Sequence, residues 1–210
     1  MKMLKWSAVA LVILVLIVSV SAYVFLKQTV ADYDGKVAIQ GLKAPVEVVR
    51  DQWGVPNIYA ENEEDAYFAL GYAMAQDRLF QMVVMKLLAQ GRMSELMGKS
   101  MIDTDMFFRV WGAAYDLDEF DQTIRDGEVF ETLDAFVKGI NHFINDPHGL
   151  LPIEFYLLGY RPEEFSIQDI GTLILVFEWT NTDSLKTEPL KAAIIREIGE
   201  DSARDLFIDH

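Results

Sequence analysis

Side chains that could act as nucleophiles or metal ligands are few in this 210-residue sequence, and none lies in a common catalytic motif. None of the eight serines sits in a G-x-S-x-G elbow or an S-x-x-K motif, and the three histidines form no H-E-x-x-H zinc site. The absence of cysteine excludes disulfides, thiolate metal sites and a thiol nucleophile. A formal net charge of −15 argues against nucleic-acid binding, which needs basic patches.

Acidic side chains at three places allow a ligand-binding interpretation beside a structural one. Asp103-Thr104-Asp105 offers oxygen ligands, but calcium needs about six to eight of them and a glycine at the turn, which favours helix caps or a solvated loop. Glu178 follows Gly171–Phe177, a run that is apolar all round and therefore expected to be buried. Such a carboxylate either has an ion-pair partner or solvent contact, or it lines a pocket. Glu188 precedes Pro189, a pair that suits the first turn of a helix.

The elements that would position these side chains begin with a predicted hairpin. Val46–Arg50 and Val55–Ala60 are rich in β-branched residues and flank a turn at 51–54. Pro56 is expected at a sheet edge or a strand start, because it cannot donate to a ladder. Asn62 is the expected N-cap of a long helix with an acidic first turn. The buried side of that helix recurs at three- and four-residue steps, at Ala69, Tyr72, Ala73, Gln76, Leu79, Phe80, Val83 and Leu87.

Further helices follow in the second half of the chain. Met106–Tyr115 is expected to be a helix with a buried aromatic side, and Glu128–Asn145 is amphipathic. Gly139 lies in the middle of the latter and indicates a close neighbouring backbone, because such a glycine costs about 1 kcal/mol relative to alanine. Ser166 and Asp169 form a capping-box variant that opens the next helix. Two last helices are expected at Lys186–Ile198 and Asp201–Phe207, separated by Gly199.

Residues 1–27 form a targeting or anchoring segment. Lys2 and Lys5 precede an uncharged run, Trp6–Leu26, which as a helix spans about 31 Å, close to the hydrocarbon thickness of a bilayer. Small residues at Val20-Ser21-Ala22 also suit a signal peptidase, so an uncleaved anchor and a cleaved signal are both open. The basic residues place the N-terminus in the cytoplasm. The chain is thus expected to be exported, either anchored in the membrane and facing outward or periplasmic or secreted.

The rest of the sequence divides into a linker and one packed region. Residues 28–45 are expected to be a linker that contains a short strand, Val37–Gln40. Residues 46–210 form one packed region, since half of the whole sequence is hydrophobic and 12% is aromatic.

This packed region resembles the penicillin amidase (penicillin acylase) family. The resemblance rests on an ordered set of motifs and covers roughly Val46 to Leu206. The motifs are GVPNIYA at 54–60, GYAMAQDRLFQM at 71–82, GRMSELMG at 91–98 and LPIEFYLLGYRPEEFSIQDI at 151–170. Asn57 departs from the family's pattern, in which many relatives carry histidine.

The resemblance implies a fold and a reaction. Members of the family are N-terminal-nucleophile hydrolases that are made as precursors and cut into an α and a β chain. It implies an α+β fold in which this chain is the mainly helical α-chain part of an αββα sandwich, completed by a β chain absent from these residues. The nucleophile would be a serine that begins the β chain after a cut before a Ser-Asn pair, and no Ser-Asn pair occurs here. No catalytic residue is therefore assigned, and the chain by itself is expected to have no catalytic activity.

The resemblance also implies binding residues. A match without gaps places Glu178, Trp179, Asn181 and Thr182 in the wall of the acyl-binding pocket. It places Glu188 as a ligand of a calcium ion (Ca²⁺) that is shared with the β chain, and no organic cofactor is expected. The substrate would be a small acylated amine, such as a β-lactam with its acyl side chain or an N-acyl homoserine lactone, hydrolysed to a carboxylic acid and an amine.

A function of another class is a membrane-anchored, non-catalytic binding module that keeps the α-chain fold. This alternative predicts that residues 28–210 are soluble and folded by themselves. The apolar helices expected at Leu79–Leu88 and Leu173–Trp179 argue against it, because they would leave apolar surface without a covering layer.

Overall fold

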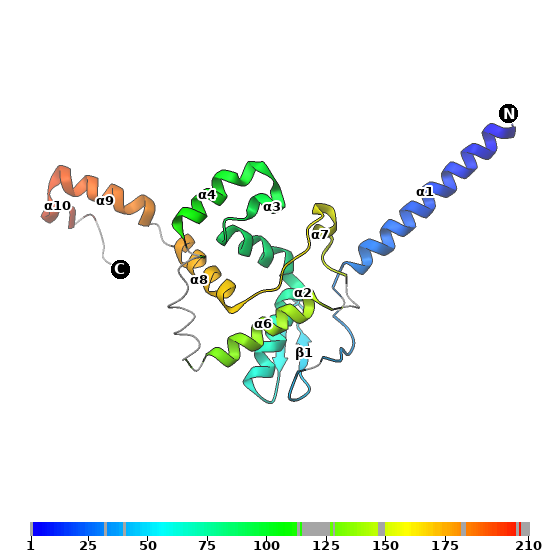
Figure 1. Ribbon diagram of the computed structural model, residues 1–210, viewed down its shortest axis with the longest axis horizontal. Coiled ribbons are helices and arrows are strands. Elements are labelled where there is room, and N and C mark those ends of the chain that lie inside the picture. The colour runs from blue at the N-terminus through cyan, green and yellow to red at the C-terminus, as the bar shows by residue number, and fades with distance from the viewer. Residues whose placement is uncertain are drawn as a thin grey trace.

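The computed structural model describes residues 2–31, 33–39, 41–112, 114, 127, 129–146, 150–181, 184–204 and 206. These residues are mostly helical, with one small hairpin at the side of the helical body (Figure 1). In chain order the elements are α1 (Lys2–Gln28), β1 (Glu47–Arg50), β2 (Pro56–Tyr59), α2 (Glu63–Ala89), α3 (Met93–Met97), the 3-10 helix η1 (Lys99–Met101), α4 (Ile102–Trp111), α6 (Phe130–Ile144), α7 (Ile153–Leu158), α8 (Ile167–Asn181), α9 (Ser184–Ile198) and α10 (Glu200–Arg204). The mainly helical character expected of the chain is confirmed.

The hairpin is antiparallel, with Glu47 opposite Tyr59 and Arg50 opposite Pro56. Its turn is held by the Asp51 carboxylate, whose Oδ1 accepts hydrogen bonds from the backbone N–H groups of Trp53 and Val55 at 2.8 and 2.9 Å. Pro56 begins β2, as its missing N–H predicts. The predicted strand–turn–strand is confirmed.

Two polar contacts fix the start of α2. The Asn62 side chain accepts a hydrogen bond from the Asp65 N–H at 3.0 Å, which confirms Asn62 as the N-cap. The buried Asp65 carboxylate in turn accepts the backbone N–H groups of Lys43 and Ala44, both at 2.9 Å. This carboxylate therefore joins the linker to the first turn of the helix.

Arg50 joins the hairpin to the middle of α2. Its guanidinium donates to the Asp77 carboxylate at 2.8 Å and to the Gln76 side chain at 3.0 Å. Arg78, which follows Asp77 in α2, has non-helical backbone angles (φ −140°, ψ 17°) and marks a kink in the helix. The hairpin is thus tied to the helix just where the helix bends.

The core lies where α2 packs against α6 and α8 (Figure 1). The closest approach is the crossing of α2 and α6, where Gly71 and Gly139 each face the backbone of the other helix. The close neighbouring backbone expected at Gly139 is confirmed. The fully buried side chains of the core include Ala75, Leu79, Val83, Leu87, Ile140 and Val176.

Several sequence expectations are corrected by this packing. The Leu79–Leu88 run of α2 is mostly covered by the chain itself, because Leu79, Val83 and Leu87 are fully buried and other apolar residues of the run are partly buried. Within the described residues no strand forms at Val37–Ile39, and Gln40 lies outside them. The helix expected at Met106–Tyr115 begins earlier, at Ile102, and ends at Trp111, because Gly112 adopts a left-handed φ of 82°; Tyr115 lies outside the described residues.

Helix α1 projects away from the body (Figure 1), and none of its segment Leu11–Gln28 is buried. With a mean hydropathy of 2.2, this segment is long and apolar enough to cross a membrane, and a signal sequence near an N-terminus has the same character.

Candidate functional site

Helix α8 carries the residues expected to line a pocket, and its start is fixed by a reciprocal cap. The Ser166 N–H donates to the Asp169 carboxylate at 2.7 Å, and the Asp169 N–H donates to the Ser166 hydroxyl oxygen at 3.2 Å. The capping box expected from the sequence is confirmed. Because this cap fixes the first residue of α8, it also fixes the side of the helix on which each later residue lies.

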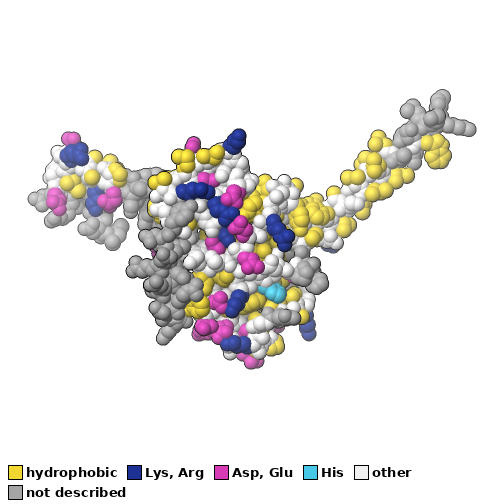
Figure 2. Space-filling model, viewed as in Figure 1, with side chains coloured by type: hydrophobic (Ala, Val, Ile, Leu, Met, Phe, Trp, Pro, Cys, Tyr) yellow, Lys and Arg dark blue, Asp and Glu magenta, His cyan; other side chains and the backbone are white. Residues whose placement is uncertain are grey.

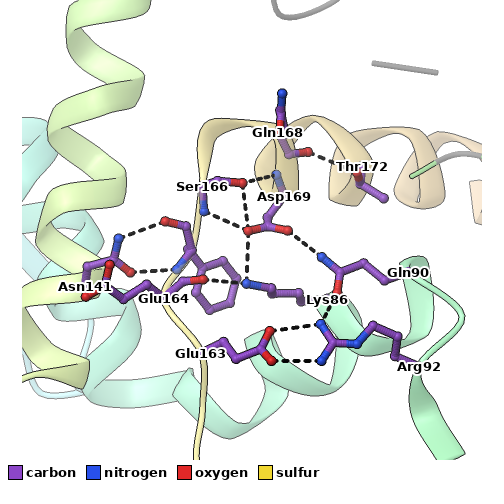
Figure 3. A network of polar contacts seen from close by, with 11 residues as sticks. Lys86, Gln90, Arg92, Asn141, Glu163, Glu164, Ser166, Gln168, Asp169 and Thr172 are labelled. Carbon is purple, nitrogen blue, oxygen red and sulfur yellow. Dashed lines mark hydrogen bonds and ion pairs between the residues drawn. The ribbon is translucent and has the colours of Figure 1, made fainter. Parts of the chain in front are cut away.

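The same Asp169 carboxylate attaches α8 to α2 (Figure 3). It forms an ion pair with the Lys86 ammonium at 3.0 Å and accepts a hydrogen bond from Gln90 Nε2 at 2.6 Å. Lys86 and Asp169 are only 6% and 9% exposed, so the pair is screened little by water. Lys86 also donates to the Glu164 carbonyl oxygen at 2.6 Å and lies 4.7 Å from the centre of the Phe165 ring.

The segment before α8 is held from two further sides (Figure 3). Asn141 of α6 binds the backbone of Phe165 twice, donating to its carbonyl at 2.8 Å and accepting its N–H at 2.7 Å. Arg92 makes two parallel hydrogen bonds to the Glu163 carboxylate, both at 2.9 Å, and these hydrogen bonds lower the pKa of Glu163. Residues 163–169 are therefore fastened to α2, α6 and the loop before α3.

The far end of α8 packs on α4 through aromatic rings. Val176 is fully buried beside Phe108 and Ala89. The half-buried Trp179 ring lies 5.3 Å from Trp111, with further rings of α4 at 5.6 and 5.8 Å. Trp179 is thus a rigid part of a cluster that α4 and α8 build together.

The side of α8 that points away from α2 is exposed, contrary to the expectation that Gly171–Phe177 is buried all round. Phe177 is 66% exposed, and Ile174 and Leu175 are 45% and 38% exposed. The described residues of α2 and α4 that pack on this end of α8 contact its Val176 and Trp179 side. On α4, the neighbouring exposed apolar side chains are Met106, Phe107 and Val110.

The predicted pocket residues do not converge within the described part of the chain. Trp179 lies in the aromatic cluster, whereas Glu178 is exposed, which agrees with its solvent-exposed interpretation. The Asn181 side chain is also exposed and donates to the Phe177 carbonyl of its own helix at 2.8 Å. Thr182 lies outside the described residues. Among the described residues, Glu178, Trp179 and Asn181 share the last turns of α8 but enclose no pocket.

Glu188 is exposed on α9, and the predicted helix start before Pro189 is wrong because α9 begins at Ser184 and contains Pro189. Its carboxylate is a hard oxygen donor of the kind that Ca²⁺ prefers. Over the described ranges no group of three or more metal-ligating side chains gathers, so a calcium ion at Glu188 would need ligands from elsewhere.

Asp105, considered above as a metal ligand or a cap, is a buried cap. Its two carboxylate oxygens accept the N–H groups of Met93 and Ser94 at 2.7 and 2.8 Å, at the start of α3. Burial by itself would raise the pKa of Asp105, but hydrogen bonds from Ser94 and Met93 outweigh it and lower the pKa. The structural interpretation of this acid is confirmed.

Sequence reasoning missed Lys86 and the ring cluster around Trp179. The position of Lys86 inside the apolar run 79–88 could have indicated a buried ion pair, because a buried ammonium requires a carboxylate partner. The aromatic residues of α4 were expected to be core, but nothing local indicates that they meet Trp179, which lies about 70 residues later.

Comparison with known proteins places these features in context. Residues 45–210 match the family model described as Penicillin amidase. The chain is 43% identical over 129 residues, 61% of its length and 16% of the relative's, to Penicillin acylase 2 proenzyme from Pseudomonas sp. (strain SE83). It is 31% identical over 169 residues, 80% of its length and 20% of the relative's, to Acyl-homoserine lactone acylase QuiP from Pseudomonas aeruginosa (strain PAO1).

The fold is also similar to a solved structure, that of a thermostable Penicillin G acylase from Alcaligenes faecalis. The TM-score is 0.58 at 23% sequence identity, and the match covers 77% of this chain and 88% of the other. At this identity the likeness concerns the fold. The chain spans about a fifth of the length of the curated relatives that it matches.

Proposed function

The chain belongs to the penicillin amidase family, and from this membership we propose that it is the α-chain part of an exported acylase that hydrolyses a linear amide. The products would be a carboxylic acid and an amine. The match of residues 45–210 to the family model is the observation that carries the proposal. Relatives are named as a penicillin acylase and as an acyl-homoserine lactone acylase, and these names support an acylated amine as the substrate class and leave the acyl group open.

The nucleophile in this proposal is the N-terminal serine of a β chain cut from the same precursor. A free α-amino group with a pKa near 7.7–8.0 can accept the proton of its own serine hydroxyl without a histidine. Support comes from the exposed apolar side of α8, where Phe177 and its neighbours form a surface of the kind that a second layer covers.

This chain would supply one wall of the acyl pocket. Trp179 is held by three aromatic rings of α4 and offers a rigid apolar surface to an acyl chain. Glu178, Asn181 and Thr182 would add polar groups on the same helix end, and Glu188 would give one oxygen to a calcium ion. The other oxygens would come from the β chain.

Helix α1 would keep the protein at the membrane as an uncleaved anchor, with the body outside the cytoplasm. Lys2 and Lys5 stand before the apolar segment, as the positive-inside rule requires of a cytoplasmic N-terminus.

Assays of the full precursor on N-acyl amides test this function. The full precursor that contains this chain should release an amine from at least one member of a panel of N-acyl amides, which includes N-acyl homoserine lactones of increasing acyl length. The Trp179→Ala precursor should show a changed preference for acyl length, with Trp53→Ala as a control on an exposed tryptophan. A processed, folded precursor that cleaves no amide in the panel would contradict the proposal.

A second experiment, expression of residues 28–210 alone, separates the acylase from the non-catalytic binding module. That alternative requires residues 28–210 to be monomeric and to unfold cooperatively without any other chain. Aggregation of this segment, relieved when the rest of the precursor is co-expressed, would instead support the acylase.

A further inference from the structure

Helix α7 packs on the body by one residue and exposes most of the others. Phe155 is 2% exposed, and its ring lies 5.5 Å from that of Phe80 on α2. In contrast, Leu157 is 77% exposed, Tyr156 is 45% exposed and Leu158 is 42% exposed. We call these three residues the α7 face. Three large apolar side chains in a row are unusual on a surface in contact with water alone.

The α7 face touches the apolar helix α1. The Phe25 ring packs edge-on against Tyr156 with 5.3 Å between ring centres. Figure 1 shows α7 beside the base of α1, and Figure 2 shows hydrophobic atoms that continue from α1 onto the adjoining edge of the body. Whatever medium covers the end of α1 therefore also reaches the α7 face.

The position of Phe25 along α1 indicates the depth at which this contact lies. Trp6 and Phe25 are 19 residues apart, about 28 Å in a helix, which is close to the roughly 30 Å of a bilayer's hydrocarbon core. Tryptophan and tyrosine gather at both boundaries of that core. If Trp6 lies at the inner boundary, then Phe25, and Tyr156 with it, lies at the outer one.

We propose that the α7 face rests in the outer boundary of the bilayer that α1 spans, as a second, interfacial contact with lipid. The inference rests on the anchoring role proposed above for α1. Two exposed basic side chains follow the contact residues closely in the sequence, Lys27 in the last turn of α1 and Arg161 just after α7, and such side chains can meet anionic headgroups. Interfacial helices bury an apolar face at this level and keep charged groups in the headgroup layer.

Two contacts instead of one would fix the orientation of the body. An anchor alone, followed by a linker, lets a domain turn freely above the membrane. With α7 also in the interface, the end of the body that carries α4 and α8 points away from the bilayer, since it lies at the opposite end from α1 (Figure 1).

A fluorescent label tests the proposal, and the absence of cysteine allows one label at one chosen site. The full chain with Leu157→Cys, labelled with an environment-sensitive dye, is reconstituted in vesicles of phosphatidylethanolamine and phosphatidylglycerol that contain spin-labelled lipid. Val110→Cys on α4, 87% exposed, is the matched control. Leu16→Cys, in the middle of α1, reports whether α1 is inserted.

The expected result is emission at shorter wavelength for the Leu157 label than for the Val110 label, with at least twofold quenching by spin-labelled lipid at Leu157 and none at Val110. Quenching at Leu16 with a water-like label at Leu157 would overturn the α7 contact and leave the anchor intact. Water-like labels at both positions would overturn the anchor and the contact together. Amide hydrolysis by the assembled enzyme is a separate readout that neither result changes.

Discussion

Gly71 of α2 and Gly139 of α6 face each other's helix backbone at the point where the two helices cross. A Cβ atom placed on Gly71 would overlap the carbonyl oxygen of Phe136, and one on Gly139 would overlap that of Phe68. The absence of side chains at both positions lets the helices approach this closely. Since α6 also holds the segment before α8 through Asn141, the crossing sets the position of the candidate pocket wall.

Gly139→Ala should destabilise the chain, although alanine is usually the better helix former by about 1 kcal/mol. The added methyl group must push α6 away from α2, and overpacking of this kind costs about 1–3 kcal/mol. Urea unfolding of the co-expressed, processed protein, followed by helical circular dichroism, measures the change. Gln81→Ala, exposed on α2, is the control and should change the free energy of unfolding by less than about 0.5 kcal/mol. A more stable Gly139→Ala chain would show that the helices are free to move apart.

Lys86→Met should cost about 3–5 kcal/mol in the free energy of unfolding, because it leaves the buried Asp169 carboxylate without its cation. Lys138→Met, which breaks the exposed ion pair with Asp134, should cost less than about 1 kcal/mol. The double variant Lys86→Met with Asp169→Leu should recover part of the loss, since no charge is then left buried. Additive losses in the double-mutant cycle would contradict direct coupling between the two residues.

Asp105 should make the chain more stable at neutral pH than in acid. Its pKa is lowered below the ordinary 3.8 in the folded state, so the unfolded chain binds this proton first as the pH falls. The contribution is therefore complete above the unfolded pKa and disappears as the pH falls through the folded pKa. Asp105→Asn should flatten the dependence of unfolding free energy on pH below about pH 5. The exposed Asp103→Asn is the control, and an unchanged acid slope in Asp105→Asn would contradict the prediction.

Phe177→Ser should leave the stability of this chain nearly unchanged but reduce assembly with the β chain. Its ring is 66% exposed, so little packing within the chain is lost, whereas a covering layer would lose an apolar contact worth about 1.5–3 kcal/mol. The measurement is the yield of processed enzyme from the co-expressed precursor. Phe177→Leu keeps an apolar side chain and should assemble normally. Equal yields from both variants would place the interface on another side of α8.

Glu188→Gln should reduce the stabilisation of the assembled enzyme by calcium. At a given calcium concentration, an ion that binds the folded protein more tightly raises the melting temperature more, and loss of one carboxylate ligand weakens that binding. The melting temperature is measured with added Ca²⁺ and with a chelator. Glu197→Gln, also exposed on α9, is the control and should keep the full calcium response. A full response in Glu188→Gln would remove this residue from the ligand set.

The features predicted correctly from the sequence are those decided by neighbouring residues. The hairpin, the Asn62 cap and the Ser166–Asp169 cap each involve residues within a few positions, where turn and capping chemistry is specific. The close helix crossing at Gly139 was also predicted correctly, because a glycine inside a helix often marks the close approach of another backbone.

The features that were missed depend on residues far apart. Lys86 and Asp169 are 83 positions apart, and nothing around either residue identifies the other. Burial of the apolar faces was misjudged for the same reason. The 79–88 face of α2 is covered by α6 and α8, whereas Phe177 is exposed, yet the two segments look equally apolar in the sequence.

The hairpin has a consequence for how this chain must be produced. In the part of the chain that the structure describes, β1 and β2 pair only with each other, so the outer edge of each strand still offers backbone donors and acceptors. An extended segment can pair with such an edge, whether it is a strand of the proposed β chain or the same hairpin of a second copy. Synthesis of both halves as one polypeptide would give the intended strand a high effective concentration and leave identical copies little opportunity to aggregate through these edges.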